Sequence, residues 1–423
     1  MLFGFPRFPG QNTLDYCKIF TLICQAFCRF FQIFPKFLVK LSKDPGKNLH
    51  FLFSRDIISS SIRFGLAEKR VFVRYALLIQ SHANVQYRQC LGKLACREAA
   101  ALLSSLGLNE CIVSEERIAG EDFVVLDAPE LTQKQLQVLG SHSGICLMAL
   151  WDGEKLLPLE RPKPDFLPES LPYVLKFKGK TNPDFTRMMI HCARGASAFG
   201  FGGEALTLYD PMCGKGTTLF CAALEGIHSV GTDLEGAGLR EAGEYLERNL
   251  KMNRVKHQLQ EKSFTLKEGR SARAWDYRMA RDSEAAKCGN QVELMMAESD
   301  FRDAGCFLKR ESVHLIVSDL PYGVQHAPKE RKRLSSLEQL AKDAFSACTP
   351  LLKIGGVMAF SFNLHTLSKD KMAVWAQESG LKVLDTFPYE DFSHWVEQAV
   401  TRDILFCRKE SAGEVGGQNL GEA

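Results

Sequence analysis

Short apolar runs alternate with stretches of helical spacing through the second half of the chain. Such an alternation of strands and helices is typical of a doubly wound, mainly parallel sheet. We therefore predict a Rossmann-like α/β domain with a seven-stranded sheet over residues 166–409. The expected strands are 206–210, 229–233, 292–297, 313–319, 357–362, 381–387 and 400–407, and the clearest helices are 215–225, 237–251, 337–352 and 369–380.

A shorter pattern precedes this domain. Its expected strands are 71–80, 111–114, 123–126 and 144–150, with helices at 91–108 and 132–139. We predict a small α/β or α+β domain over residues 69–165, and it is a candidate for RNA binding. The proline-rich stretch 158–172 is the expected linker between the two domains.

Both ends of the chain depart from this regular pattern. Residues 16–41 are rich in Phe, Ile, Leu and Cys, but charged and amide residues interrupt the apolar run. These interruptions argue against both a signal peptide and a membrane span. We expect residues 1–68 to be a packing extension, or to follow from a start codon placed too far upstream, with membrane attachment as the alternative. Residues 410–423, rich in Gly and Glu, are expected to be disordered.

Charge and cysteine content narrow the class of protein. The formal net charge of the 423-residue chain is only +3, so any nucleic-acid contact must come from local patches. The 14 cysteines include no Cys-x-x-Cys pair, which is typical of reduced thiols in a cytoplasmic protein. We expect neither a disulfide framework nor a metal site.

A glycine-containing loop joins the first strand of the larger domain to a helix. It begins at Asp210 and contains Gly214 and Gly216, which allow a tight turn and close approach to a ligand. In a doubly wound sheet this edge is where ligands bind. We therefore take Asp210, Gly214 and Gly216, with Met212 and Thr217 beside them, as candidate cofactor residues.

Two phosphate-binding motifs are excluded at this loop. A P-loop would need Gly where Tyr209 stands and Ser or Thr where Gly216 stands. A dinucleotide fingerprint would need a third Gly where Leu219 stands, and the carboxylate of Asp210 would repel a diphosphate at the helix N-terminus. An acid here suits a cationic ligand such as the amino group and sulfonium of S-adenosylmethionine.

Two further acids follow the next strands in order. Asp233 ends the second strand, and an acid there accepts hydrogen bonds from a ribose diol. Asp300 follows the third strand and is expected to accept from an adenine amino group, while Phe301 packs against the ring. Leu234 and Asn182 complete the set of candidate cofactor residues. Each acid alone could be a turn or capping residue, but three in this order indicate one cofactor site.

The fourth strand ends in Asp319-Leu-Pro-Tyr-Gly323. An exocyclic amino nitrogen of a base is a poor nucleophile, because its lone pair is delocalised into the ring. Asp319 and the backbone carbonyl before Pro321 are expected to accept its N–H bonds and so stabilise the transition state. Tyr322 is expected to stack on the flipped base. Asp319, Pro321 and Tyr322 are therefore the candidate catalytic residues.

Basic residues beyond this loop are candidate substrate contacts. Gly323 permits a tight exit, while His326, Lys329 and Arg331 are candidates for contact with RNA phosphate. A solvated surface is the alternative for these side chains. The segment 254–287 is basic and polar, and we interpret it as an insertion that is a further candidate for RNA contact.

Several of these motifs resemble the bacterial branch of the tRNA guanine-N2 methyltransferase family. The similarity rests on the motifs at 210–218, 256–257, 319–326, 355–363 and 402–404 and extends over residues 170–408. It implies a Rossmann-like methyltransferase fold, S-adenosyl-L-methionine as the cofactor and transfer to N2 of a guanosine in tRNA. In this family Asp319 would bind the target amino group, and the helix beginning near Thr181-Asn-Pro183 would close over the methionine end of the cofactor. The region at 71–165 is short for the RNA-binding part that family members usually carry.

Two other functions remain as alternatives. A DNA adenine or cytosine amino-methyltransferase uses the same catalytic logic, although no sizeable target-recognition domain follows the loop. A catalytically silent subunit that only presents RNA would lose the catalytic acid or the glycine loop, and this chain retains both.

Overall fold

The computed structural model describes residues 72–411 apart from 83–84, 175–179, 204 and 323–329, and for 85–87 and 330–335 it describes only the backbone. The first elements form a five-stranded antiparallel sheet in the order β2-β3-β1-β4-β5. Apolar side chains of α3 and α4 pack on one face of this sheet, so the predicted small domain is α+β. Its elements are β1 (Phe72–Ile79), α3 (Val85–Ser105), β2 (Ile112–Ile118), β3 (Glu121–Pro129), α4 (Gln133–Gly140), β4 (Ile145–Trp151) and β5 (Leu156–Leu159).

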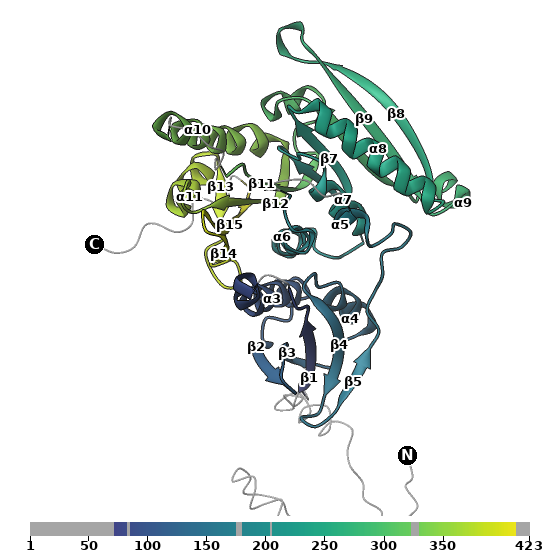
Figure 1. The fold of residues 1–423 in the computed structure, drawn as a ribbon, viewed down its shortest axis with the longest axis vertical. Coiled ribbons are helices and arrows are strands. Elements are labelled where there is room, and N and C mark those ends of the chain that lie inside the picture. Colours follow the sequence, from purple (N-terminus) through teal and green to yellow (C-terminus); the bar gives the residue numbers. More distant parts are fainter. Residues whose placement is uncertain (1–71, 83–84, 175–179, 204, 323–329, 412–423) are drawn as a thin grey trace, which may run out of the picture. The chain divides into compact units, whose positions relative to one another are not determined.

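A second, ten-stranded sheet forms the core of the rest of the chain (Figure 1). Its order is β13-β15-β12-β11-β6-β7-β10-β9-β8, with β14 paired to β15. The strands are β6 (Thr207–Asp210), β7 (His228–Asp233), β8 (Lys256–Thr265), β9 (Ser271–Ala280), β10 (Val292–Glu298), β11 (Val313–Asp319), β12 (Leu352–Asn363), β13 (Leu381–Val383), β14 (His394–Glu397) and β15 (Val400–Lys409).

Helices cover both faces of this sheet, because the central strands are apolar on both sides. Leu208, Leu315 and Met296 belong to clusters formed with α6, α7 and α8 on one face. Tyr209 and Ile316, one position further along, pack with α10 and α11 on the other. The helices are α5 (Leu171–Val174), α6 (Pro183–Ala196), α7 (Thr217–Leu224), α8 (Gly236–Met252), α9 (Ser283–Lys287), α10 (Glu330–Cys348) and α11 (Lys369–Glu378).

The predicted fold class is confirmed, and the seven predicted strands all lie in this sheet in a mainly parallel, doubly wound order. Several boundaries were wrong. Both ends of the predicted linker 158–172 have regular secondary structure, because β5 and α5 overlap them. The helix predicted from residue 337 begins at Glu330, and the strand predicted over 381–387 ends at Val383.

The segment 254–287, predicted as an insertion, contains two strands of the central sheet. β8 and β9 form a hairpin whose second strand pairs antiparallel with β10, so the hairpin extends the central sheet at its edge (Figure 1). One row of β9 side chains is buried, including Ala272 and Ala274. Five of the segment's basic residues form ion pairs. These pairs are Lys262–Asp276, Arg270–Asp303, Arg273–Glu298, Arg278–Glu293 and Arg281–Asp165.

Candidate functional site

The predicted acids meet at one edge of the central sheet. β6, β7 and β10 are parallel neighbours, and their register pairs Asp210 with Gly231 and Glu298 with Asp233. β11 lies on the other side of β6, so Asp319 ends at the same edge. The acids therefore form a row along the carboxyl ends of four adjacent strands, in the spatial order Asp319, Asp210, Asp233 and Asp300.

Asp210 is the most deeply buried of these acids, with 2 % of its surface exposed. Its Oδ1 atom accepts hydrogen bonds from Ser318 Oγ at 2.7 Å and from the Met212 backbone N–H at 3.1 Å. Burial raises the pKa of Asp210 to about 6, although hydrogen bonds from Ser318 and Thr218 oppose the shift. A cationic partner would stabilise the ionised form of this buried carboxylate, which fits the expected role of Asp210 in cofactor binding.

The glycine loop is tied to the second acid. The Gly214 backbone N–H donates to Asp233 Oδ2 at 2.8 Å, and Glu235 N–H donates to Asp233 Oδ1 at 2.9 Å. Gly214 and Gly216 have φ values of +52° and +79°, a region that favours glycine. A Cβ atom at Gly231 would lie 2.7 Å from Cys213 Sγ, so the loop packs directly on the bare backbone of β7.

The third acid and the residue after it make contacts within the protein that the sequence did not predict. Asp300 accepts from the Arg302 backbone N–H at 2.9 Å and from Arg302 Nη1 at 2.8 Å, so it is already ion-paired. Phe301 is only 4 % exposed and packs in the cluster of Tyr209, which leaves little of its ring for an adenine. Leu234, beside Asp233, is 74 % exposed and offers an apolar surface at this edge.

Asn182 and Thr217 serve the starts of two helices. Asn182 is the N-cap of α6, and its side chain accepts from the Asp184 backbone N–H at 2.9 Å. Thr217 is the first residue of α7 and is buried. Thr217 directly follows the glycine loop, whereas the contacts described for Asn182 are those of a helix N-cap.

Asp319 lies within a set of hydroxyl groups. Its Oδ1 atom accepts from Ser361 Oγ at 2.7 Å and from the Tyr322 hydroxyl, and its Oδ2 atom accepts from Thr181 Oγ1. These partners come from β12, from the loop after β11 and from the residue before the N-cap of α6. Sequence reasoning placed Thr181 and Ser361 in motifs but gave them no role, because their contacts with Asp319 span 138 and 42 residues.

Arg402 is a further residue that sequence reasoning missed. It is 5 % exposed, and its Nε atom donates to the Tyr322 hydroxyl at 2.6 Å. Its Nη2 atom is 3.7 Å from Asp319 Oδ2, and its guanidinium carbon is 5.3 Å from the Tyr322 ring centroid. The hydroxyl of Tyr322 thus points to Asp319 and Arg402 in this structure. The late Arg-Asp-Ile motif was the one sequence signal at this position.

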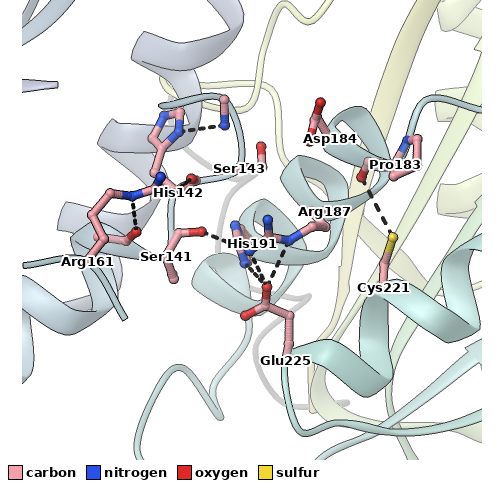
Figure 2. A network of polar contacts seen from close by, with 12 residues as sticks. Ser141, His142, Ser143, Arg161, Pro183, Asp184, Arg187, His191, Cys221 and Glu225 are labelled. Carbon is pink, nitrogen blue, oxygen red and sulfur yellow. Dashed lines mark hydrogen bonds and ion pairs between the residues drawn. The ribbon is translucent and has the colours of Figure 1, made fainter. Parts of the chain in front are cut away.

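A buried polar network connects the small domain to α6, which precedes the glycine loop. Figure 2 shows His191 and Arg187, both of α6, directed at Glu225 at the end of α7. His191 Nε2 lies 3.2 Å from Glu225 Oε1, and His191 Nδ1 lies 2.6 Å from Glu98 Oε1 in α3. Burial alone would lower the pKa of His191, but Glu225 and Glu98 raise it to about 9. His191 therefore lies between a carboxylate of the small domain and one at the end of α7.

Several predicted substrate contacts fall outside the described structure. Gly323, His326 and Lys329 lie in the segment 323–329, and of Arg331 the structure describes only the backbone, in α10. Pro321, two residues before this segment, is exposed. Among the residues that the structure describes, no group of His, Cys, Asp and Glu could hold a metal ion, and no helix is long and apolar enough to cross a membrane.

Residues 203–368 match the family UPF0020, described as "RMKL-like, methyltransferase domain". The match covers the glycine loop, the row of acids and the Asp319 loop. The cofactor of such a methyltransferase domain is S-adenosylmethionine, as predicted. The narrower resemblance to a tRNA guanine-N2 branch stays a prediction. A search of the curated proteins gives no significant match.

Solved structures with a similar arrangement are distant. A methyltransferase homolog from Pyrococcus horikoshii is 12% identical, with 81% of this chain and 88% of that chain covered and a TM-score of 0.34. A TehB-like methyltransferase from Corynebacterium glutamicum is 13% identical, with 53% and 87% covered and a TM-score of 0.30. An rRNA methylase from Streptococcus thermophilus is 10% identical, with 55% and 99% covered and a TM-score of 0.28. Likeness at this level supports no inference about function. By its sheet order and by the family match, the chain has the fold of an S-adenosylmethionine-dependent methyltransferase.

Proposed function

We propose that this protein transfers a methyl group from S-adenosylmethionine to an exocyclic amino nitrogen of a base in RNA, most specifically N2 of guanine in tRNA. The observation that carries the proposal is the position of Asp319. It follows Ser318, which hydrogen-bonds Asp210, so the catalytic and cofactor acids lie on adjacent strands within one hydrogen-bonded unit. Residues 203–368 also match a family described as "RMKL-like, methyltransferase domain", which supports methyl transfer.

The residues at the sheet edge fit the expected cofactor. Asp210 would receive the cationic methionine end, and Asp233 would accept from the ribose hydroxyls beside the backbone of Gly214. Leu234 and Asp300 would lie at the adenine, with Asp300 retaining free lone pairs next to Arg302. S-adenosylmethionine supplies an electrophilic methyl group on a sulfonium, and this chain needs no covalent intermediate to transfer it.

Asp319 would supply the carboxylate that accepts a hydrogen bond from the target amino group. A carboxylate that accepts an amino N–H bond favours the pyramidal nitrogen that develops during transfer, which is stabilisation of the transition state. Tyr322 and Pro321 would flank the flipped base. A carboxylate beside an aromatic side chain favours an amino nitrogen over a hydroxyl group as the acceptor of the methyl group.

The test is methyl transfer by the purified protein with labelled S-adenosylmethionine and bulk tRNA or rRNA from a strain lacking the gene. Label in N2-methylguanosine that is lost with Asp319→Ala supports the proposal. The matched control Asp282→Ala removes an exposed capping acid of α9 and should retain transfer. Label in another base would still support an amino-methyltransferase but would overturn the assignment of guanine as the target. Transfer to DNA but to no RNA would favour the DNA amino-methyltransferase.

A further inference from the structure

The acceptor capacity of one oxygen of Asp319, Oδ1, is already in use. Oδ1 receives hydrogen bonds from Ser361 and from Tyr322, and Oδ2 receives one from Thr181. A carboxylate oxygen has two in-plane lone pairs, so Oδ1 has no lone pair left for a further donor. A target amino group that hydrogen-bonds Oδ1 must therefore displace one of these hydroxyl groups.

Tyr322 is the partner that can leave. Ser361 lies within β12, which is paired on both sides by β11 and β15, and it is fully buried. Tyr322 instead lies in the loop after β11, where the chain has left the sheet and Leu320 makes the last backbone bond to Ser361. Moving the tyrosine ring costs no sheet hydrogen bond, whereas moving Ser361 would disrupt a central strand.

We propose that Tyr322 has two positions and that its hydroxyl, in the position seen here, holds the Oδ1 acceptor that the target amino group needs. This inference rests on the proposed function. When a base enters, the hydroxyl gives up its hydrogen bond to Asp319 and the ring moves onto the face of the base. The tyrosine thus keeps the carboxylate hydrogen-bonded until a base with an amino group replaces it. A base edge that carries no N–H donor cannot make this exchange.

Arg402 is the positioning residue for this exchange. Its Nε atom donates to the Tyr322 hydroxyl at 2.6 Å, which favours the inward position. Its guanidinium carbon lies 4.5 Å from the Phe185 ring centroid, so the side chain is fixed from the opposite side by α6. When the hydroxyl leaves, Arg402 remains 3.7 Å from Asp319 Oδ2 and compensates its charge.

Steady-state methylation of RNA by Tyr322→Phe tests the first part of the proposal. The variant keeps an aromatic ring for stacking and removes the competing hydroxyl. We expect KM for RNA to fall about tenfold, because the protein no longer spends most of its time in a position that excludes the base. Tyr322→Ala, which removes stacking as well, should raise KM. Tyr75→Phe, which removes a buried hydroxyl that accepts from Leu131 N–H in the small domain, is the matched control and should leave KM unchanged. An unchanged or higher KM for Tyr322→Phe overturns the proposal.

A double-mutant cycle with Arg402→Lys tests the second part. Lysine keeps the charge but loses the planar guanidinium that donates to the hydroxyl. We expect Arg402→Lys to lower KM in the natural chain and to have little further effect on KM in Tyr322→Phe. If the two changes in KM simply multiply, Arg402 does not act through Tyr322 and its assignment is wrong.

The same cycle on the unfolding midpoint without RNA separates this inference from the proposed function. Coupling between Tyr322→Phe and Arg402→Lys in the free protein supports the inward contact even if no RNA is methylated. Independent effects on the midpoint would overturn the inward contact while an active enzyme would still support the proposed function. Binding of S-adenosylmethionine to each variant shows whether the cofactor site has remained folded.

Discussion

The Nδ1 atom of His191 lies 2.6 Å from Oε1 of Glu98, and both side chains are fully buried. His191 belongs to α6, whose N-terminal end follows Thr181, a hydrogen-bond donor to Asp319. Glu98 belongs to α3 of the small domain and is also held by the backbone N–H and hydroxyl of Ser143. One buried contact therefore connects the small domain to the helix that begins beside the hydrogen-bond partner of Asp319.

We predict that His191→Gln lowers the free energy of unfolding by about 3–5 kcal/mol, because it leaves two buried carboxylates without their shared cation. The measurement is urea or guanidinium unfolding followed by circular dichroism. His365→Gln, at an exposed histidine bonded to Thr401, is the control and should change the free energy by about 0.5 kcal/mol or less. An effect of His191→Gln as small as that of the control would contradict an ionised network.

The same network predicts a pH dependence of stability. The pKa of His191 is raised to about 9 in the folded protein, so its contribution is complete below the unfolded value near 6.5 and is lost as pH rises through about 9. Burial favours the protonated forms of Glu98 and Glu225, but the histidines, with Arg187 at Glu225, hold both pKa values at about 2. The carboxylate contribution is therefore present above about 4.5 and is lost as pH falls through about 2.

Unfolding of the natural chain and of His191→Gln over this range checks the prediction. The difference in unfolding free energy between the two proteins should shrink between about pH 6.5 and about pH 9. A difference that stays constant over this interval would show that His191 is neutral in the folded protein.

Cofactor binding should also depend on pH. Burial raises the pKa of Asp210 to about 6, and only its ionised form attracts the cationic end of S-adenosylmethionine. We predict that the Kd is lowest above about pH 7 and increases as pH falls through about 6, approaching tenfold per pH unit below that value. Isothermal titration calorimetry measures this. Asp210→Asn should bind more weakly and without this pH dependence, and a parallel pH dependence in both proteins would contradict the role of Asp210.

The packing of the glycine loop predicts a sensitive position in β7. The added Cβ atom in Gly231→Ala would lie 2.7 Å from both Cys213 Sγ and Leu219 Cδ1. We expect a loss of about 1–3 kcal/mol in stability and a weaker affinity for S-adenosylmethionine, because the loop must move away from the strand. Gly305→Ala, where the added Cβ meets no atom within 4 Å, is the matched control. Equal behaviour of the two variants would show that the close approach is unimportant.

Much of the larger domain could be predicted from the sequence because its strands are short apolar runs and its acids mark their ends. Asp210, Asp233 and Asp319 lie at one sheet edge as expected. The β8–β9 hairpin could not be recognised, since β8 is an edge strand and its side chains are largely exposed and polar. A strand that buries neither face lacks the apolar periodicity by which a strand is predicted.

The partners of the acids were harder to predict than the acids. Thr181, Ser361 and Arg402 meet at the Asp319 loop only because α6, β12 and β15 converge there. The role of Tyr322 on the face of a base stays a prediction, whereas the hydrogen bond from its hydroxyl to Asp319 was not predicted. The type of a residue suggests its chemical role, but its contacts with distant segments depend on tertiary packing.

The most direct test of the central claim compares Asp319→Asn with the natural chain in two measurements on the same preparations: binding of S-adenosylmethionine and single-turnover transfer to RNA. Asparagine preserves shape and an acceptor oxygen but removes the negative charge. We predict an unchanged Kd for the cofactor and a transfer rate lower by on the order of 10²- to 10³-fold. A transfer rate close to that of the natural chain, with cofactor binding intact, would contradict the assignment of Asp319 as the acid that activates the target amino group.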